Sequence, residues 1–490
     1  MGIVIKQSIK NTIITYIGFG IGAINTLFMY GQFLGDTFYG LVTFILSSAN
    51  IMMPLMAFGV HNTLVKFYNE YETEEKKSQF LTFVLVLPLL IILPVSLMGY
   101  FGYHQIAELL SQKNPIVYDY VWQIPVIGLC MGYFEIFYSW VKVHLQSVYG
   151  SFVKEVLLRI LISIFLFAVY FDVISPQQFV FALMGIYFLS LIAMFFYAMK
   201  VKLPHLKLVF PDNYKAILTY CFFIILSGSV ANMLLDVDKF MLNFYININN
   251  IAFYSVAIFI ATVIAVPSRA MHQITHPITA KLMSENKHDE LNELYKKSSI
   301  TLQVIGGLIL VGILVNSKEL YSVLPIGYSE GIAVVFFIGI SKYIDLVLGN
   351  NNAIIFNSKY YQAVLFLGLF LVLLTVSLNM IFIPLYGLNG AAIATLISIT
   401  LYSLAKLLFV VLKLKLFPFT KNTIVALVIT ITSFGVFFYW DFSFHPFVNI
   451  ILKSILVSLF YLGLSYYLKI SSDINFVINS VLKRVFKNNS

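Results

Sequence analysis

Four cationic side chains lie inside long apolar runs of the sequence: Arg159, Arg269, Lys342 and Lys406. A cation in such a run faces the interior of a helical bundle or extends to a membrane interface. An interior arginine suits a phosphate or carboxylate, because its planar guanidinium donates two hydrogen bonds at once. The sequence therefore predicts four candidate contacts for an anionic ligand. Extension to the cytoplasmic interface stays open for Arg159, Arg269 and Lys406, whereas Lys342 lies deeper in its run.

Two carboxylates also lie inside apolar runs, Glu135 and Asp345. A carboxyl group in apolar surroundings can bind and release a proton, so both are candidates for coupling to an ion gradient. Asp345 is three residues from Lys342, on the same helical face, where the two can pair. The alternative is that Asp345 only neutralises Lys342.

A third charged group, Asp236, Asp238 and Lys239, is expected near the outer end of an apolar run. These residues are candidates for an outer gate between two halves of a bundle. The alternative is a solvated helix end.

The composition places the chain in a membrane. It is 60% hydrophobic and 11% charged, with a mean hydropathy of +0.89, whereas soluble proteins carry about 25% charged residues. The net charge of +9 is attributed to topology and anionic lipid rather than to nucleic acid. Cys130 and Cys221 both lie in apolar runs and indicate neither disulfide nor metal.

The apolar windows predict an all-α polytopic protein with about fourteen transmembrane helices. Lysine and arginine collect in alternate links, which places both termini in the cytoplasm. The predicted spans are 11–32, 38–61, 79–103, 117–141, 151–171, 177–199, 215–235, 250–272, 299–316, 331–351, 360–383, 388–411, 422–440 and 447–468.

Similar short segments recur about 210–220 positions apart, always at the same place in a six-span unit. Residues 38–45 read FYGLVTFI and residues 253–260 read FYSVAIFI. The spacing predicts two six-helix, pseudo-symmetric parallel repeats, a device of transporters. The predicted parts are an N-terminal lobe over 1–208, a C-terminal lobe over 209–418, an extra transmembrane helix pair over 419–470 and a cytoplasmic amphipathic tail over 471–490.

The chain resembles the polysaccharide-transporter branch of the multidrug/oligosaccharidyl-lipid/polysaccharide flippase superfamily. The resemblance is carried by residues 235–242 (LDVDKFML), 253–257 (FYSVA) and 383–395 (IPLYGLNGAAIAT), and by the plan of twelve spans plus a pair. It implies an O-antigen or capsule flippase that moves a polyprenyl-pyrophosphate-linked oligosaccharide from the cytoplasmic to the outer leaflet of a bacterial inner membrane by alternating access.

The implied partners are the lipid-linked oligosaccharide, membrane lipids and, as a further possibility, a glycan polymerase and other envelope-assembly proteins. Such a protein needs a wet, positively lined passage for the head group, because each unpartnered polar group in hydrocarbon costs several kcal/mol. The alternatives are a cation-coupled multidrug exporter, a peptidoglycan-precursor flippase and, less favoured, a membrane glycan polymerase. No catalytic constellation, cofactor motif or metal-ligand spacing is evident, so no enzyme activity, cofactor or metal is expected.

Overall fold

The computed structural model describes residues 2–204, 209–227, 230–360 and 362–487. Contacts within the chain define two compact units, Met1–Ser255 and Val256–Ser490. The predicted lobe boundary at residue 208 lies in a gap between the described ranges. The predicted boundary separates two sequence repeats, whereas the boundary at Ser255 separates two groups of contacts. The predicted boundary therefore stays a prediction. The described residues form helices and connecting turns, with no strand among them.

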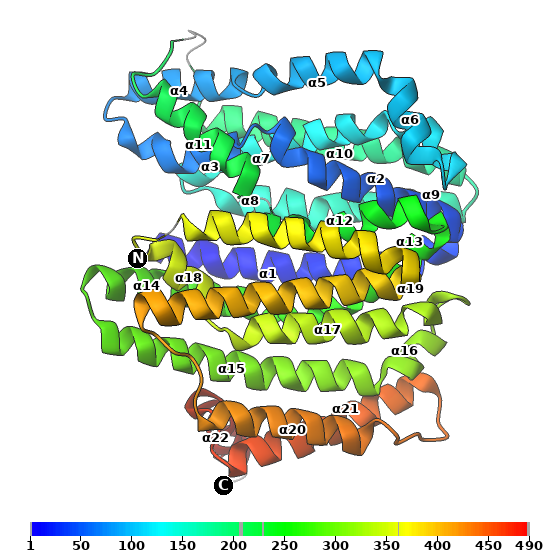
Figure 1. The fold of residues 1–490 in the computed structure, drawn as a ribbon, viewed down its shortest axis with the longest axis vertical. Helices are drawn as coiled ribbons and strands as arrows, with labels where there is room; N and C mark the ends of the chain where they lie inside the picture. The colour runs from blue at the N-terminus through cyan, green and yellow to red at the C-terminus, as the bar shows by residue number, and fades with distance from the viewer. Residues whose placement is uncertain (1, 205–208, 228–229, 361, 488–490) are drawn as a thin grey trace. The chain divides into compact units, whose positions relative to one another are not determined.

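In its described residues, the first unit contains twelve α-helices and the start of a thirteenth, with short π- and 3-10-helical segments between them (Figure 1). Its elements are α1 (Gly2–Ile24), η1 (Asn25–Leu34), α2 (Gly35–Met56), α3 (Val60–Phe67), η2 (Tyr68–Glu70), α4 (Glu74–Val86), α5 (Leu89–Phe101), α6 (Tyr103–Ser111), η3 (Pro115–Tyr120), α7 (Gln123–Val143), α8 (Ser147–Phe152), η4 (Val153–Leu157), α9 (Leu158–Tyr170), α10 (Pro176–Val201), α11 (Tyr214–Ser227), α12 (Val230–Tyr245) and α13 (Ile248–Thr262), which crosses into the second unit.

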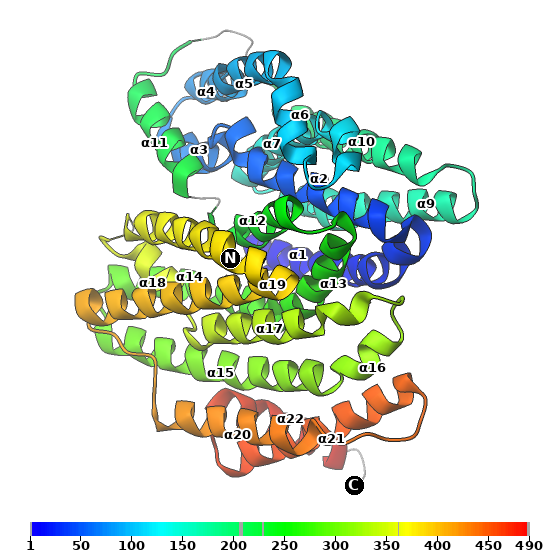
Figure 2. The same cartoon turned by 45° about the vertical axis from the view of Figure 1, so that its right-hand side comes forward.

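The second unit also consists of α-helices with short π- and 3-10-helical segments between them. Its helices α20 and α21 pack side by side (Figure 2). Its elements after α13 are η5 (Val263–Ala265), α14 (Val266–Ser284), α15 (His288–Val315), α16 (Ser317–Ser322), η6 (Tyr328–Gly331), α17 (Ile332–Val347), α18 (Asn351–Asn357), α19 (Ala363–Phe409), η7 (Val410–Leu414), α20 (Lys421–Phe437), α21 (Pro446–Tyr467) and α22 (Ser472–Lys487).

Eight helical stretches of the described residues are long and apolar enough to cross a membrane, or nine if one bent pair counts as a span. Two of the eight are more than twice as long as one crossing needs: Lys10–Met56 with 47 residues and Phe366–Leu414 with 49, against about 20 for a span. The first stretch turns at Gly35, where φ is 73°. The all-α membrane architecture is confirmed, while the number fourteen stays a prediction.

The second of these long stretches is a hairpin within α19 (Figure 1). The turn lies at Gly387, which has φ 56° and ψ −127°, a conformation that glycine adopts without steric cost. Three residues later, a side chain on Gly390 would lie 2.0 Å from the carbonyl oxygen of Phe382. The two glycines therefore allow the chain to reverse tightly, where the sequence predicted the end of one span and the start of the next.

The charged residues of the seventh predicted span do not lie at a helix end. The prediction ended that span at residue 235, but α12 continues to Tyr245 and contains Asp236, Asp238 and Lys239. Asp236 and Lys239 form an ion pair of 3.4 Å, and the fully buried Asp238 accepts a hydrogen bond of 2.8 Å from Tyr254. Because these charges are paired within the first unit, α12 can contain them along its length rather than at its end. The alternative of a solvated helix end is therefore wrong.

A buried lysine connects the final helix pair to the rest of the second unit. Lys453 of α21 is 1% exposed, and its ammonium group donates to Glu319 of α16 and, over 3.0 Å, to Asp441 after α20. The hydrogen bond from Lys453 holds the pKa of Asp441 below its ordinary value. A carboxylate from another helix makes the burial of this lysine possible.

Replacing Lys453 with methionine is expected to destabilise the protein by about 3–5 kcal/mol, because Glu319 is then left buried without its partner. The double variant Lys453→Met/Glu319→Gln should recover most of the loss, and Asp441→Asn should cost little because Asp441 is 61% exposed. Thermal unfolding in detergent measures all three variants. A double variant as unstable as Lys453→Met would contradict this account.

Candidate functional site

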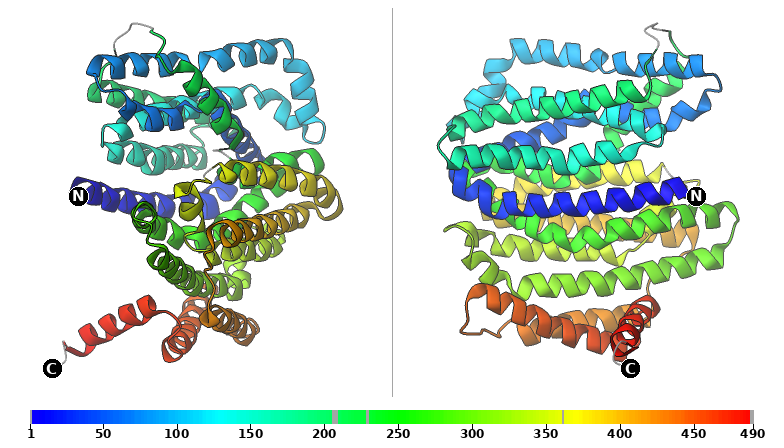
Figure 3. Two further views of the ribbon diagram at one scale, coloured as in Figure 1. Left: turned by 60° about the vertical axis from the view of Figure 1, so that its left-hand side comes forward. Right: turned by 180° about the vertical axis from the view of Figure 1, so that it is seen from behind.

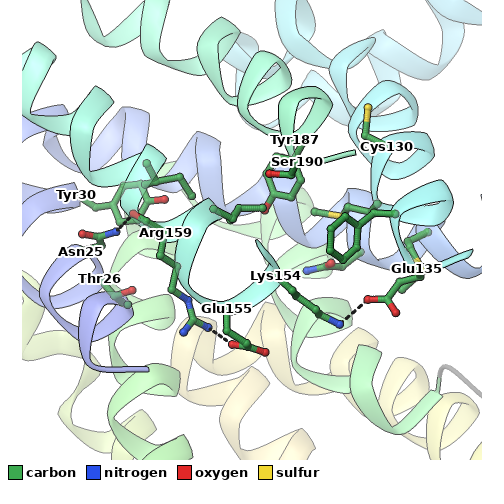
Figure 4. A pocket seen from close by; sticks show the side chains of 17 residues that line it. Asn25, Thr26, Tyr30, Cys130, Glu135, Lys154, Glu155, Arg159, Tyr187 and Ser190 are labelled. Carbon is green, nitrogen blue, oxygen red and sulfur yellow. Dashed lines mark hydrogen bonds and ion pairs between the residues drawn. The ribbon is translucent and has the colours of Figure 1, made fainter. Parts of the chain in front are cut away.

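The first unit encloses a cavity of about 380 Å³, a size typical of small-ligand sites. Its wall comes from α1 and η1, from α2, from α7, and from η4, α9 and α10 (Figure 4). The lining residues are Gly22, Asn25, Thr26, Tyr30, Asn50, Met53, Cys130, Met131, Phe134, Glu135, Lys154, Glu155, Leu158, Arg159, Ile162, Tyr187 and Ser190. A space of this size with so many polar groups has room for on the order of ten waters.

Two ion pairs lie in the cavity wall (Figure 4). Lys154 of η4 bonds to Glu135 of α7 over 2.5 Å, and Arg159 of α9 bonds to Glu155, one turn earlier, over 3.2 Å. The two cations and two carboxylates sum to zero formal charge. The sequence predicted a positively lined passage, whereas the cations of this cavity are already neutralised by glutamates.

Arg159 keeps hydrogen-bonding capacity beyond its ion pair. Its Nη1 is buried and has no hydrogen-bond partner among the described residues. The guanidinium can lie this close to α1 because the facing residues are Gly18 and Gly22, whose missing side chains would fall 2.9 Å from Nη1 and 3.2 Å from Nε. An unsatisfied buried donor costs free energy, so a water or a ligand oxygen is favoured at Nη1.

Two π-helical segments shape the cavity. η1 carries Asn25, Thr26 and Tyr30, and η4 carries Lys154 and Glu155; η1 packs against α9, and η4 against α1. In the right-hand view of Figure 3, the blue α1 runs beside the teal α9. Asn25 donates 3.0 Å to the carbonyl oxygen of Arg159 and accepts 2.8 Å from Ser163, which ties η1 to α9. Helical segments of this wide type are frequent at functional sites.

A second charged cluster lies in the second unit. Lys406 of α19 is 2% exposed and donates 2.9 Å to Asp345 of α17 and 3.4 Å to Asn352 of α18. Its ammonium group also lies 4.4 Å from the centre of the Tyr402 ring, a cation–π contact. A cavity of about 20 Å³ adjoins this pair. Lys406 is thus buried and paired, and does not extend to an interface.

The structure brings some of the predicted site residues together and separates others. Arg159 and Glu135 line the cavity of the first unit, and Lys406 and Asp345 form the pair of the second unit. Arg269 is exposed on α14, and neither Arg269 nor Lys342 is among the lining residues of either cavity. The gate role predicted for Asp236, Asp238 and Lys239 stays a prediction.

The sequence analysis missed Lys154, Glu155 and the polar residues of η1 as cavity residues. Lys154 and Glu155 looked like the ordinary start of a span, and a single π-helical turn leaves little trace in the hydrophobic period. A signal was present in Gly18 and Gly22, because small residues four apart mark close helix packing in membranes. The facing helix could still not be identified from the sequence.

The Glu135–Lys154 pair gives a measurable expectation. Lys154→Met leaves the carboxylate of Glu135, whose side chain is 13% exposed, without its partner, and should destabilise the protein by about 1–3 kcal/mol. Glu135→Gln in the same chain should restore most of the melting temperature. A double-mutant cycle of thermal unfolding measures the coupling; additive effects of the two substitutions would show that the pair is not coupled.

Long apolar helices, together with a charged and polar cavity enclosed within one helical unit, define a multi-pass membrane protein of the transporter class. Residues 4–283, more than half of the chain, match the family described as polysaccharide biosynthesis protein. The chain belongs to this family, and the branch of the flippase superfamily recognised in its sequence is confirmed.

One curated relative and several solved structures extend this result. The probable flippase AglR of Haloferax volcanii is 28% identical over 177 residues, which span 34% of this chain and only 36% of the relative. The lipid II flippase MurJ in an inward closed conformation has a TM-score of 0.72 at 19% identity and covers 94% of this chain and 99% of its own.

An inward-facing multidrug resistance MATE family transporter of the MOP superfamily has a TM-score of 0.57 at 14% identity, with 82% of this chain and 94% of its own covered. A MOP superfamily transporter from Pyrococcus furiosus has a TM-score of 0.58 at 12% identity, with coverages of 84% and 96%. At these identities, the likeness to the solved structures shows the fold alone, which is the fold of MOP transporters.

Proposed function

We propose that this protein is a flippase that carries a polyprenyl-pyrophosphate-linked oligosaccharide from the cytoplasmic to the outer leaflet of the cytoplasmic membrane. Its product would serve surface polysaccharide synthesis, where a glycan polymerase would consume it. The proposal is supported by the polysaccharide biosynthesis family and by the partial match to a probable flippase. Because that relative is archaeal, the membrane would be a prokaryotic cytoplasmic membrane, with both termini of the protein on its inner side.

The observation that carries the proposal is the charged cavity of the first unit. A pyrophosphate with several sugars cannot cross hydrocarbon at a useful rate, because each unpartnered polar group costs several kcal/mol there. The cavity offers hydroxyl and amide groups for sugar hydroxyls, from Asn25, Thr26, Asn50, Tyr187 and Ser190. The polyprenyl tail would remain in lipid.

Arg159 and Lys154 are proposed to bind the pyrophosphate by exchanging partners. In the structure, each cation is neutralised by a glutamate. An arriving pyrophosphate would replace these carboxylates as the anion, and the planar guanidinium suits two of its oxygens. Release to the other leaflet would restore the two ion pairs. An empty carrier would thus never leave its cations unpaired, which keeps the cost of returning without substrate low.

The purified protein in liposomes tests the proposal. Fluorescent lipid-linked oligosaccharide is placed in both leaflets, and a membrane-impermeant quencher reports how much of the inner-leaflet pool reaches the outside. We expect transport of the pyrophosphate-linked oligosaccharide and slow or no transport of a neutral glycolipid with the same tail. In cells, deletion should leave the lipid-linked oligosaccharide in the cytoplasmic leaflet.

Parallel arms separate the alternatives. A peptidoglycan precursor in the same assay tests the function named for MurJ, whose fold this chain shares. Efflux of a cationic dye tests the multidrug alternative, for which the MATE fold is the precedent. Transport of the peptide-bearing lipid alone, or of the dye alone, would reject the proposed substrate.

A further inference from the structure

The second unit contains a polar cluster to which the proposed function gives no role. His272 of α14 faces a small cavity together with Ser268, Asp345, Asn351, Asn352 and Lys406, and apolar residues of α15 and α17 close it. The cavity measures about 20 Å³, and a single water needs about 10–15 Å³. The space therefore accommodates one water.

Two buried atoms on residues of this wall lack hydrogen-bond partners among the described residues. They are Nδ1 of His272 and Oδ1 of Asn351. The amide nitrogen of Asn351 is already used, since it donates 2.7 Å to Tyr295, which fixes the side chain. An enclosed water needs two to four polar partners, and these two atoms with the ammonium group of Lys406 provide them.

We propose that His272, one enclosed water and the Asp345–Lys406 ion pair form a proton-binding site in the second unit. The Asp345 side chain is 49% exposed, and it is the group through which a proton would enter the site. The proton that reaches the carboxyl group of Asp345 is handed to the water as the water gives one of its own to the imidazole of His272. Asp345 then returns to the carboxylate form. No bond between heavy atoms forms or breaks, and the occupied site gains one positive charge.

The surroundings of His272 explain how a proton bound there would affect the neighbouring charged groups. On α14 its ring lies against His276, with centroids 5.8 Å apart, and Arg269 is three residues earlier. The charges of Asp345 on α17 and Lys406 on α19 act on His272. Around these groups, Lys342 acts on Asp345, Tyr402 lies against the ammonium group of Lys406, and Tyr295 of α15 bonds to Asn351. A proton on His272 would place a second positive charge beside that of Lys406. It would repel the ammonium group of Lys406 and attract the carboxylate of Asp345 to the histidine. The Asp345–Lys406 pair, which joins α17 to α19, would loosen.

The existence of the site does not depend on the proposed function; only its role in transport rests on that function. The first test therefore uses no substrate. The full-length protein is labelled at its histidine rings with ¹³C and ¹⁵N, reconstituted in nanodiscs and titrated between pH 4.5 and 8.5. The variant His272→Gln assigns the resonance. We expect the His272 ring to titrate within this range.

Asp345→Asn and Lys406→Met are expected to move the midpoint of the His272 titration in opposite directions, because one removes a negative and the other a positive charge. A shift of at least half a pH unit in each is expected. Asp441→Asn, which removes a distant exposed carboxylate, should leave the midpoint unchanged. A His272 ring that does not titrate, or that responds no more to Asp345→Asn than to Asp441→Asn, would overturn the inference.

A second measurement tests the role in transport. In liposomes, the wild-type rate of lipid transport should change at least threefold across the His272 titration, and His272→Gln should flatten this profile. His288→Gln serves as the control, since His288 is an exposed histidine of the same unit that does not line the cavity. Transport with an unchanged pH profile in His272→Gln would reject the role, whereas absence of transport in every variant would reject the proposed function and leave the titration to decide on the site.

Discussion

Arg159→Lys is expected to reduce lipid transport about 10–100-fold without unfolding the protein. The substitution keeps the positive charge but removes the planar fork, and with it one or more charge-assisted hydrogen bonds worth about 1.5–3 kcal/mol each. Each 1.4 kcal/mol corresponds to a factor of about ten. The reason is local: Arg159 lines the cavity, pairs with Glu155 and keeps a buried nitrogen without a partner among the described residues.

The measurement is the initial rate of oligosaccharide-lipid transport in liposomes, with melting temperature recorded in parallel. Lys281→Met is the control, because it removes a cation whose side chain is 72% exposed, and it should transport at the wild-type rate. A lysine variant that transports within twofold of wild type would show that any cation at this position suffices. A loss in melting temperature equal to that of Lys154→Met would assign Arg159 a structural role instead.

Gly18→Ala is expected to lower the melting temperature and to reduce transport at least tenfold. A methyl group on Gly18 would lie 2.3 Å from the carbonyl oxygen of Glu155 and 2.9 Å from Nη1 of Arg159. Since the first contact is with backbone, α1 must move away from η4, and overpacking of this kind costs about 1–3 kcal/mol. The displacement also moves the guanidinium from its place in the cavity wall.

Gly20 provides a matched control two residues away. A side chain on Gly20 meets nothing within 4 Å, and alanine favours a helix over glycine by about 1 kcal/mol. Gly20→Ala should therefore leave transport unchanged and keep or raise the melting temperature. Equal behaviour of the two variants would contradict the close packing of α1 against η4. Thermal unfolding and the liposome assay together separate a loss of stability from a loss of function.

Hydropathy and turn residues predicted the course of the chain well. The reversal at Gly387 falls at the break between the predicted spans 360–383 and 388–411, and within the described residues every predicted span is mostly helical, although spans such as 38–61 and 79–103 each cover more than one helix. These features depend on local sequence, since apolar runs partition into lipid and glycine permits a tight reversal. The fold class followed for the same reason.

Pairing between helices was beyond sequence reasoning. Lys342, three residues from Asp345, was predicted as its partner and does act on it electrostatically, but the ion pair of 2.9 Å that joins two helices connects Asp345 to Lys406, 61 positions away. Likewise Lys154 reaches Glu135 from a different helix. A single sequence shows which charges are present in the spans but not which helices are neighbours, so the neutralised cavity and the buried Lys453 could not be foreseen.

The π-helical turn at Val153–Leu157 has an evolutionary consequence. Such a turn holds one residue more than an α-helical turn of the same length, and each residue rotates a helix by about 100°. Loss of a single codon in this stretch would restore a regular helix and swing Lys154 and Glu155 to another side relative to Arg159. Insertions and deletions, more readily than point substitutions, could therefore have diversified which cargo such proteins accept.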